Sequence, residues 1–206
     1  MSLNSYALTS LDRLKTFLGI TSSDYDTVLE YMINSVSDFV ENECDRRFKK
    51  TAYSDVKLDG QSSRELILPQ WPVISGETFT LYERKNSSDY GDDEWVAIDS
   101  NDYRVDNDSG IVKASFTFVR GFQNYKVNYT AGYDFDVSEE TYLSDVGLSD
   151  LENIVWKLTG RVYNERKIPS NISRMKLYNY DVAFSKEAFS DDEIKEVLSK
   201  YQRFSF

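Results

Sequence analysis

The sequence predicts an α+β protein in which N- and C-terminal helices form one helical unit, interrupted by a central antiparallel β region. Apolar residues recur at spacings of three and four within residues 1–50 and again within 140–206. Between residues 51 and 133 the spacing changes to two, which is typical of half-buried strands. With 206 residues, 40% of them hydrophobic, the chain is long enough to bury a substantial core.

The first segment predicts two helices that pack as a hairpin. Thr9 or Ser10 is placed to cap the first helix, and Gly19 suits the left-handed residue that ends it. A second helix is expected to begin near Ser23. Its apolar face follows helical spacing and consists of Val28, Leu29, Met32, Val36, Phe39, Val40 and Cys44. Because Cys44 lies on this face, we interpret it as a buried small hydrophobe rather than a reactive thiol.

The middle of the chain predicts a half-buried antiparallel sheet or a small barrel. Two segments, 112–118 and 125–131, alternate apolar and polar residues. A turn at 106–110, rich in Asp, Asn and Gly, predicts a hairpin within 103–112 rather than a calcium loop, which would need a glutamate at its twelfth position. Further strands are expected at 56–58, 65–68, 78–84, 94–98 and 103–105.

Helical spacing returns near Ser149, which with Glu152 three residues later matches a capping box. This helix is expected to reach about Arg166 and to end before Pro169. An irregular stretch and a short last helix, opened by Ser190, then follow.

We expect residues 174–206 to form a docking arm that is loosely ordered in the free protein. Its charged and aromatic anchors have no evident intramolecular core, whereas its capped last helix is expected to fold in place. Pro169 separates the arm from the preceding helix, and its charged and aromatic side chains suit contact with a partner. On this hypothesis a chain truncated at Ser190 folds with a nearly unchanged melting temperature.

The composition argues against most kinds of catalytic site and against a nucleic-acid-binding site. The chain contains no histidine, which removes the usual general base and the usual zinc ligand. A net charge of −11 opposes phosphate binding. No apolar run is long enough to span a membrane, and one cysteine cannot form an intramolecular disulfide. We therefore expect an intracellular protein that has no cofactor and is not an enzyme.

Two charged clusters are candidate sites. Residues 1–150 carry 27 acidic and 14 basic residues, whereas residues 151–206 carry 8 and 10. The basic and aromatic residues of the C-terminal quarter are candidates for contact with a partner or a neighbouring subunit: Arg161, Arg166, Lys167, Arg174, Lys176, Tyr201, Arg203, Phe204 and Phe206. A second set is a candidate acidic channel wall or rim: Asp89, Asp92, Asp93 and Glu94. The alternative for these carboxylates is a metal-dependent enzyme.

Several short sequences, taken in order, resemble the head-tail connector, or adaptor, family of tailed phages and prophages. They begin with Leu-Thr-Ser-Leu at 8–11 and Phe-Leu-Gly-Ile at 17–20, then Cys-Asp-Arg-Arg-Phe at 44–48. The series continues with Leu-Pro-Gln-Trp-Pro-Val at 68–73 and the hairpin at 103–112, and it reaches Val-Asn-Tyr-Thr-Ala-Gly-Tyr at 127–133. It ends with Leu-Glu-Asn-Ile at 151–154 and Tyr-Asn-Glu-Arg at 163–166.

The resemblance implies a structural protein of the virion neck, made in the cytoplasm of a bacterial host. Members of this family form a ring, dodecameric in the virion, below the portal protein. The ring extends the DNA channel and docks the next neck or tail-completion protein, with DNA as a passenger. No catalytic residues carry over, and the alternative within the same class is another neck or tail-completion protein.

Overall fold

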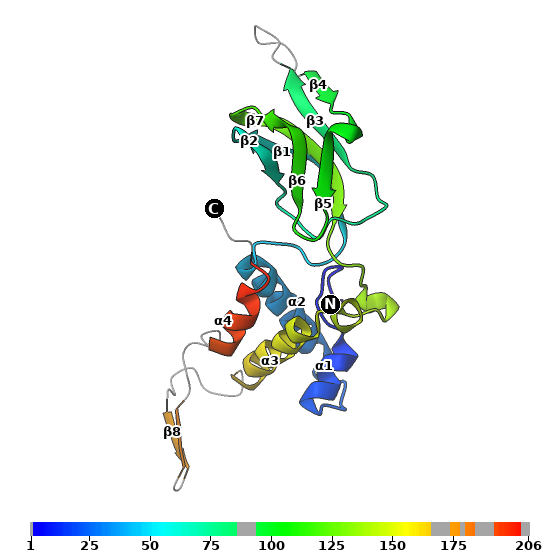
Figure 1. The fold of residues 1–206 in the computed structure, drawn as a ribbon. Coiled ribbons are helices and arrows are strands. Elements are labelled where there is room, and N and C mark those ends of the chain that lie inside the picture. Colours follow the sequence, from blue (N-terminus) through cyan, green and yellow to red (C-terminus); the bar gives the residue numbers. More distant parts are fainter. Residues whose placement is uncertain (1, 86–93, 166–173, 178–179, 184–191, 203–206) are drawn as a thin grey trace. The chain divides into compact units, whose positions relative to one another are not determined.

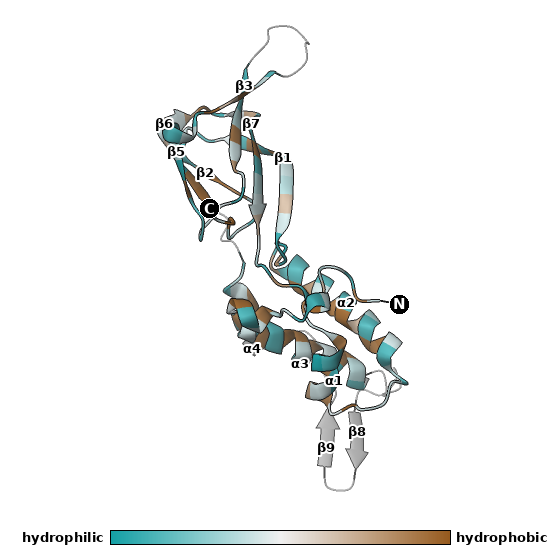
Figure 2. Cartoon of the chain, turned by 90° about the vertical axis from the view of Figure 1, so that its right-hand side faces the viewer, coloured by the Kyte–Doolittle hydropathy of each residue, from teal (hydrophilic) through white to brown (hydrophobic). Residues whose placement is uncertain are grey.

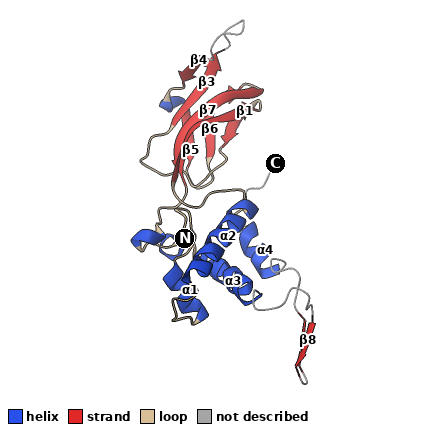
Figure 3. Cartoon of the chain, turned by 180° about the vertical axis from the view of Figure 1, so that it is seen from behind, coloured by secondary structure: helices blue, strands red, loops and turns tan. Residues whose placement is uncertain are grey.

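The computed structural model describes residues 2–85, 94–165, 174–177, 180–183 and 192–202. The chain divides into two compact units, one formed by Met1–Arg46 with Phe135–Phe206 and the other by Arg47–Asp134. Strands β1 to β7 all belong to the second unit, which we call the β unit (Figures 1 and 3). The four α-helices belong to the first, the helical unit. These observations confirm the α+β class.

The helical unit begins with α1 (Leu11–Leu18) and α2 (Asp26–Glu43). Ser10 caps α1, with its side chain accepting from the backbone N–H of Arg13, and Gly19 ends the helix in the left-handed region at φ 66°. Both expected signals at the ends of α1 are therefore confirmed.

The buried face of α2 is rotated relative to the predicted face. Its buried apolar residues are Leu29, Met32, Ile33, Val36 and Val40. Val28, assigned to this face from the sequence, is exposed, and Phe39 is only partly buried. Successive residues lie about 100° apart around the helix axis. Because Ile33 is buried, the centre of the buried face lies away from Val28. Figure 2 shows the resulting brown and teal sides of the helices.

The third helix, α3 (Ser149–Glu165), ends within one residue of the predicted position but does not begin with the predicted capping box. Its first turn closes when the backbone N–H of Glu152 donates to the carbonyl of Leu148 at 3.1 Å, so Ser149 already lies inside the helix. The Glu152 side chain instead bonds to residues far away in the sequence. The short 3-10 helices η2 (Val137–Glu139) and η3 (Leu143–Val146) precede α3.

One expectation for the C-terminal segment is wrong. The stretch expected to be irregular contains an antiparallel hairpin, β8 (Arg174–Leu177) paired with β9 (Tyr180–Ala183). The last helix, α4 (Asp192–Ser199), buries Ile194 and Leu198. With these buried side chains, α4 contributes to the core of the helical unit, to which it belongs. The proposed cap at Ser190 lies outside the described residues.

The β unit contains two antiparallel sheets rather than the single sheet or barrel that alternation suggested. The first has strand order β1-β7-β3-β4 and the second β2-β6-β5. The strands are β1 (Thr51–Gly60), β2 (Ser63–Ile67), β3 (Thr80–Lys85), β4 (Glu94–Ala97), β5 (Tyr103–Asp106), β6 (Ile111–Phe118) and β7 (Gly121–Ala131). The 3-10 helix η1 (Ser100–Asp102) leads into β5.

The core of the β unit is supplied by both sheets. Leu66, Val112 and Phe118 come from the second sheet, and they share one apolar cluster with Leu81 and Val127 from the first. The ring of Phe118 meets that of Tyr125 edge to face, with centroids 5.0 Å apart. The predicted β5–β6 hairpin is confirmed, and Gly110 at its turn has φ 63°.

Candidate docking surfaces

A polar cluster of the helical unit is built around Glu152, whose side chain is almost completely buried. The guanidinium of Arg13 contacts both carboxylate oxygens, Nε to Oε1 at 3.0 Å and Nη2 to Oε2 at 3.1 Å. The Thr9 hydroxyl donates to Oε1 at 3.4 Å and accepts from the indole N–H of Trp156 at 2.7 Å. Arg13 Nη2 also donates to Ser144 Oγ at 3.2 Å. This cluster ties α1, η3 and α3 together.

Burial raises the pKa of Glu152 above its ordinary value, while Arg13, Ser144 and Thr9 each act to lower it. The carboxylate is therefore a structural anchor whose desolvation is only partly compensated by its partners. Sequence reasoning missed this role, because the contact to Arg13 spans 139 residues and the local pattern offered a capping box instead.

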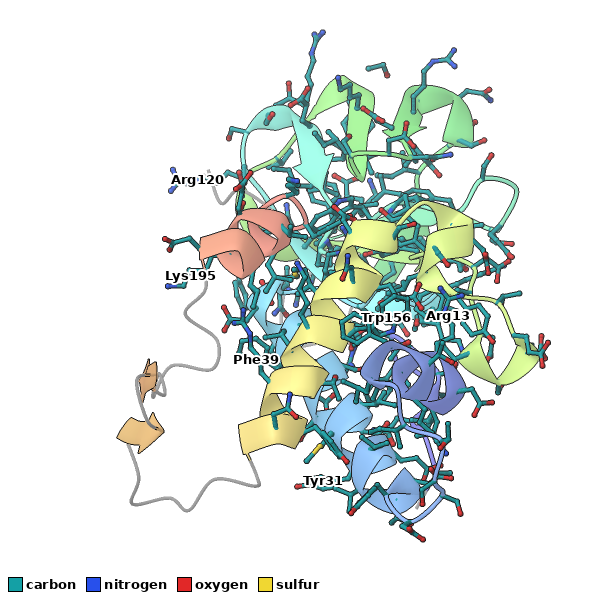
Figure 4. The ribbon with its side chains drawn as sticks, turned by 90° about the horizontal axis from the view of Figure 1, so that it is seen from below. Arg13, Tyr31, Phe39, Arg120, Trp156 and Lys195 are labelled. Carbon is teal, nitrogen blue, oxygen red and sulfur yellow. The ribbon has the colours of Figure 1, made fainter. Side chains whose placement is uncertain are left out.

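A pocket opens on the surface beside this cluster. It has a volume of about 390 Å³ and is lined by Asp12, Arg13, Thr16, Phe17 and Trp156. The rings of Phe17 and Trp156 lie 5.5 Å apart, and Phe17 is exposed. Figure 4 shows Arg13 and Trp156 beside one another. We call this the α1–α3 pocket.

The β unit has an exposed apolar site of its own at the turn between β6 and β7. Val119 and Phe122 have 62% and 76% of their surface exposed, and Arg120 lies between them. Arg120 and Phe122 also line a pocket of about 500 Å³ with residues 59–62. We call residues 119–122 the turn knob.

Cys44 has no accessible surface, as the sequence predicts. Burial raises the pKa of its thiol to about 12, and its Sγ lies 3.8 Å from the carbonyl oxygen of Leu198 on α4. The thiol is therefore protonated at neutral pH and packs between α2 and α4 as an apolar group.

The structure describes part of the predicted basic and aromatic set. Arg161 is partly buried on α3, and the backbones of Arg174 and Lys176 lie on β8. The partly buried Tyr201 donates a hydrogen bond to Asp150. The remaining members, which lie outside the described residues, are Arg166, Lys167, Arg203, Phe204 and Phe206.

Of the predicted acidic rim, Glu94 is described, as an exposed residue at the start of β4. Asp89, Asp92 and Asp93 lie outside the described residues. Within the described part of the chain, no group of three or more Cys, Asp or Glu side chains is arranged to hold a metal ion. A search of the described helices for one long and apolar enough to cross a membrane also finds none.

The model of the family described as "Head completion protein" matches residues 7–149. The chain therefore belongs to the head completion protein family, which is consistent with the predicted resemblance to phage connectors. No curated protein matches the sequence.

Solved structures share the fold over the whole chain. One is from the neck of an empty gene transfer agent particle, computed with C6 symmetry, with a TM-score of 0.54 and 14% identity. Two others are from the native virion and from the native neck computed with C12 symmetry, each with a TM-score of 0.53 and 14% identity. Each match covers 100% of this chain and 97% of the other.

Proposed function

We propose that this protein is a structural head-tail connector in the neck of a tailed phage or phage-like particle, where it forms a ring below the portal. The observation that carries the proposal is the family match over residues 7–149. The shared fold with proteins of a neck computed with C12 symmetry supports the ring, which on this proposal holds twelve copies. In this role the protein is not an enzyme.

The charge distribution supports a DNA channel rather than a DNA-binding site. The sequence carries a net charge of −11. Clustered cations would bind phosphates by displacing counterions, whereas an acidic wall repels them and lets DNA pass. We infer that DNA is a passenger and that Glu94, with its acidic neighbours at 89–93, belongs to the rim of the channel.

The basic C-terminal quarter supplies the proposed contact with the portal or the neighbouring subunit. Arg174 and Lys176 are both on β8, and two-stranded hairpins are only marginally stable alone. A partner that contacts the β8–β9 hairpin would stabilise it, and an acidic surface on that partner would complement the charges of Arg174 and Lys176. Because α4 is packed into the helical unit, the proposed contact rests on the β8–β9 hairpin.

The test is co-purification of the full chain with the portal protein and, separately, with the tail-tube protein of the same particle. We expect portal binding that weakens when Arg174 and Lys176 are both changed to Glu. Lys195→Glu is the matched control, because Lys195 is an exposed cation on α4 outside the proposed surface (Figure 4). Binding to the tail tube alone would favour the second candidate function, a tail-completion protein.

A further inference from the structure

The turn knob is held in a fixed conformation although its side chains face solvent. The backbone N–H of Val119 donates to Tyr125 Oη at 2.8 Å, and the Asn124 side chain donates to the carbonyl of Val119 at 2.8 Å. Asn124 also accepts from the N–H of Gly60 at 2.8 Å. A Cβ on Gly60 would lie 1.7 Å from the Val119 carbonyl oxygen, so only glycine permits this close approach of β1. These contacts therefore fix the turn in a conformation in which Phe122 is exposed.

The chemistry of the knob suits a protein contact. Aromatic and arginine side chains dominate the binding energy of protein interfaces, and here Phe122 and Arg120 are two residues apart. Within the described part of the chain, Arg120 forms no salt bridge. The nearby carboxylate of Asp59 accepts instead from the backbone N–H of Gln123 at 2.7 Å. The knob thus offers an aromatic ring and a positive charge that has no ion pair among the described residues.

The α1–α3 pocket offers the complementary features. Two of its walls are the rings of Phe17 and Trp156, and its volume of about 390 Å³ exceeds the roughly 150 Å³ of a cavity that binds benzene. The charge of Arg13 is balanced by Glu152 at 3.0 Å. Asp12, exposed and without an ion pair among the described residues, therefore gives the pocket a negative charge that is not balanced locally.

We propose that the turn knob of one subunit docks into the α1–α3 pocket of a second copy of this chain. Phe122 inserts beside Phe17 and Trp156, and Arg120 faces Asp12. Knob and pocket lie on different units of the chain, so the contact is heterologous and repeats from copy to copy. Closure of this repeat into a ring rests on the proposed connector function, whereas the pairwise contact does not.

The test uses cysteines placed beside each surface in separate full-length chains. Gln61→Cys lies in the pocket that Phe122 also lines, and Thr16→Cys lies in the α1–α3 pocket. Native Cys44 is buried and protonated, so it does not compete for the cross-linker. We expect a short bismaleimide to join the two different chains when they are mixed at high concentration. Phe122→Ala in both chains should weaken association by about tenfold or more, as measured by sedimentation equilibrium.

Two controls establish specificity. Ser35→Cys, exposed on α2 and outside the pocket, replaces Thr16→Cys as a matched partner and should give little adduct. Arg120→Asp should reduce the adduct, and Asp12→Arg in the other chain should restore it. The proposal is overturned if the two different chains give no adduct, or if Ser35→Cys gives as much adduct as Thr16→Cys.

The outcomes separate this contact from the connector function. If the chains bind the portal but give no specific adduct, the knob contact is contradicted and the connector function is still supported. If the chains give a specific adduct but do not bind a portal, the knob contact is supported and the connector function is contradicted.

Discussion

At the scale of single residues, the buried Glu152 is held by a residue that lies far away in the sequence. Its partner Arg13 is brought to it only when α1 packs on α3, and no local pattern encodes that pairing. The α1–α3 pocket was missed for the same reason.

The buried carboxylate predicts a pH-dependent effect of Glu152→Gln. Burial raises the pKa of Glu152, so the folded protein holds this proton more tightly than the unfolded chain. The tighter binding of this proton stabilises the folded protein fully below the ordinary pKa of 4.5. This stabilisation is lost as the pH rises through the higher pKa that Glu152 has in the folded protein. We expect the stability of Glu152→Gln relative to the wild type to increase between pH 4 and pH 7 in urea titrations. A difference that stays constant, or falls, would show that burial does not dominate.

The buried face of α2 predicts a contrast between two substitutions. Leu29 is fully buried, so Leu29→Asp places an unpaired carboxylate in the core and should cost several kcal/mol, roughly the stability of a small domain. Tyr31→Asp, two residues on, changes an exposed side chain and should stay within about 0.5 kcal/mol. Thermal melting followed by circular dichroism measures both. Equal melting temperatures would mean that the helix face is assigned incorrectly.

At the scale of elements, strands were predicted well where one face is buried and the other wet, as in β6 and β7. Alternation fixes the face of each strand but not its neighbours, so the division into two sheets was not predictable. The β8–β9 hairpin was missed although residues 174–177 and 180–182 alternate polar and apolar side chains, because each alternating run is only three or four residues long. The contact between α4 and Cys44 could not be predicted, because the two lie far apart in the sequence.

Packing of α4 predicts that a chain ending at Ser190 is destabilised, contrary to the expectation from sequence. The truncation removes the buried Ile194 and Leu198, each worth about 1.5–3 kcal/mol of apolar burial. Leu198→Ala in the full chain should cost about 2–5 kcal/mol, whereas Glu196→Ala at an exposed position should be nearly neutral. Denaturant unfolding measures the free energy of unfolding of these three variants. A truncated chain as stable as the full chain would show that α4 does not contribute to the core.

At the scale of the whole molecule, the division into units predicts that the β unit folds alone. Its ends are tied by backbone hydrogen bonds: Lys50 N–H donates to the Tyr133 carbonyl at 2.8 Å, and Tyr133 N–H to the Phe48 carbonyl at 2.7 Å. A fragment of residues 47–134 should therefore give a cooperative melt and the circular dichroism of a β protein. A fragment that stays unfolded would show that its stability depends on the helical unit.

The central claim, a ring of this protein below the portal, is tested most directly by electron microscopy of the purified chain mixed with its portal. We expect a ring of density attached to one face of the portal, with as many copies of the chain as there are portal subunits. Portals that remain undecorated at saturating chain concentration, or density for this chain only on the tail tube, would contradict the claim.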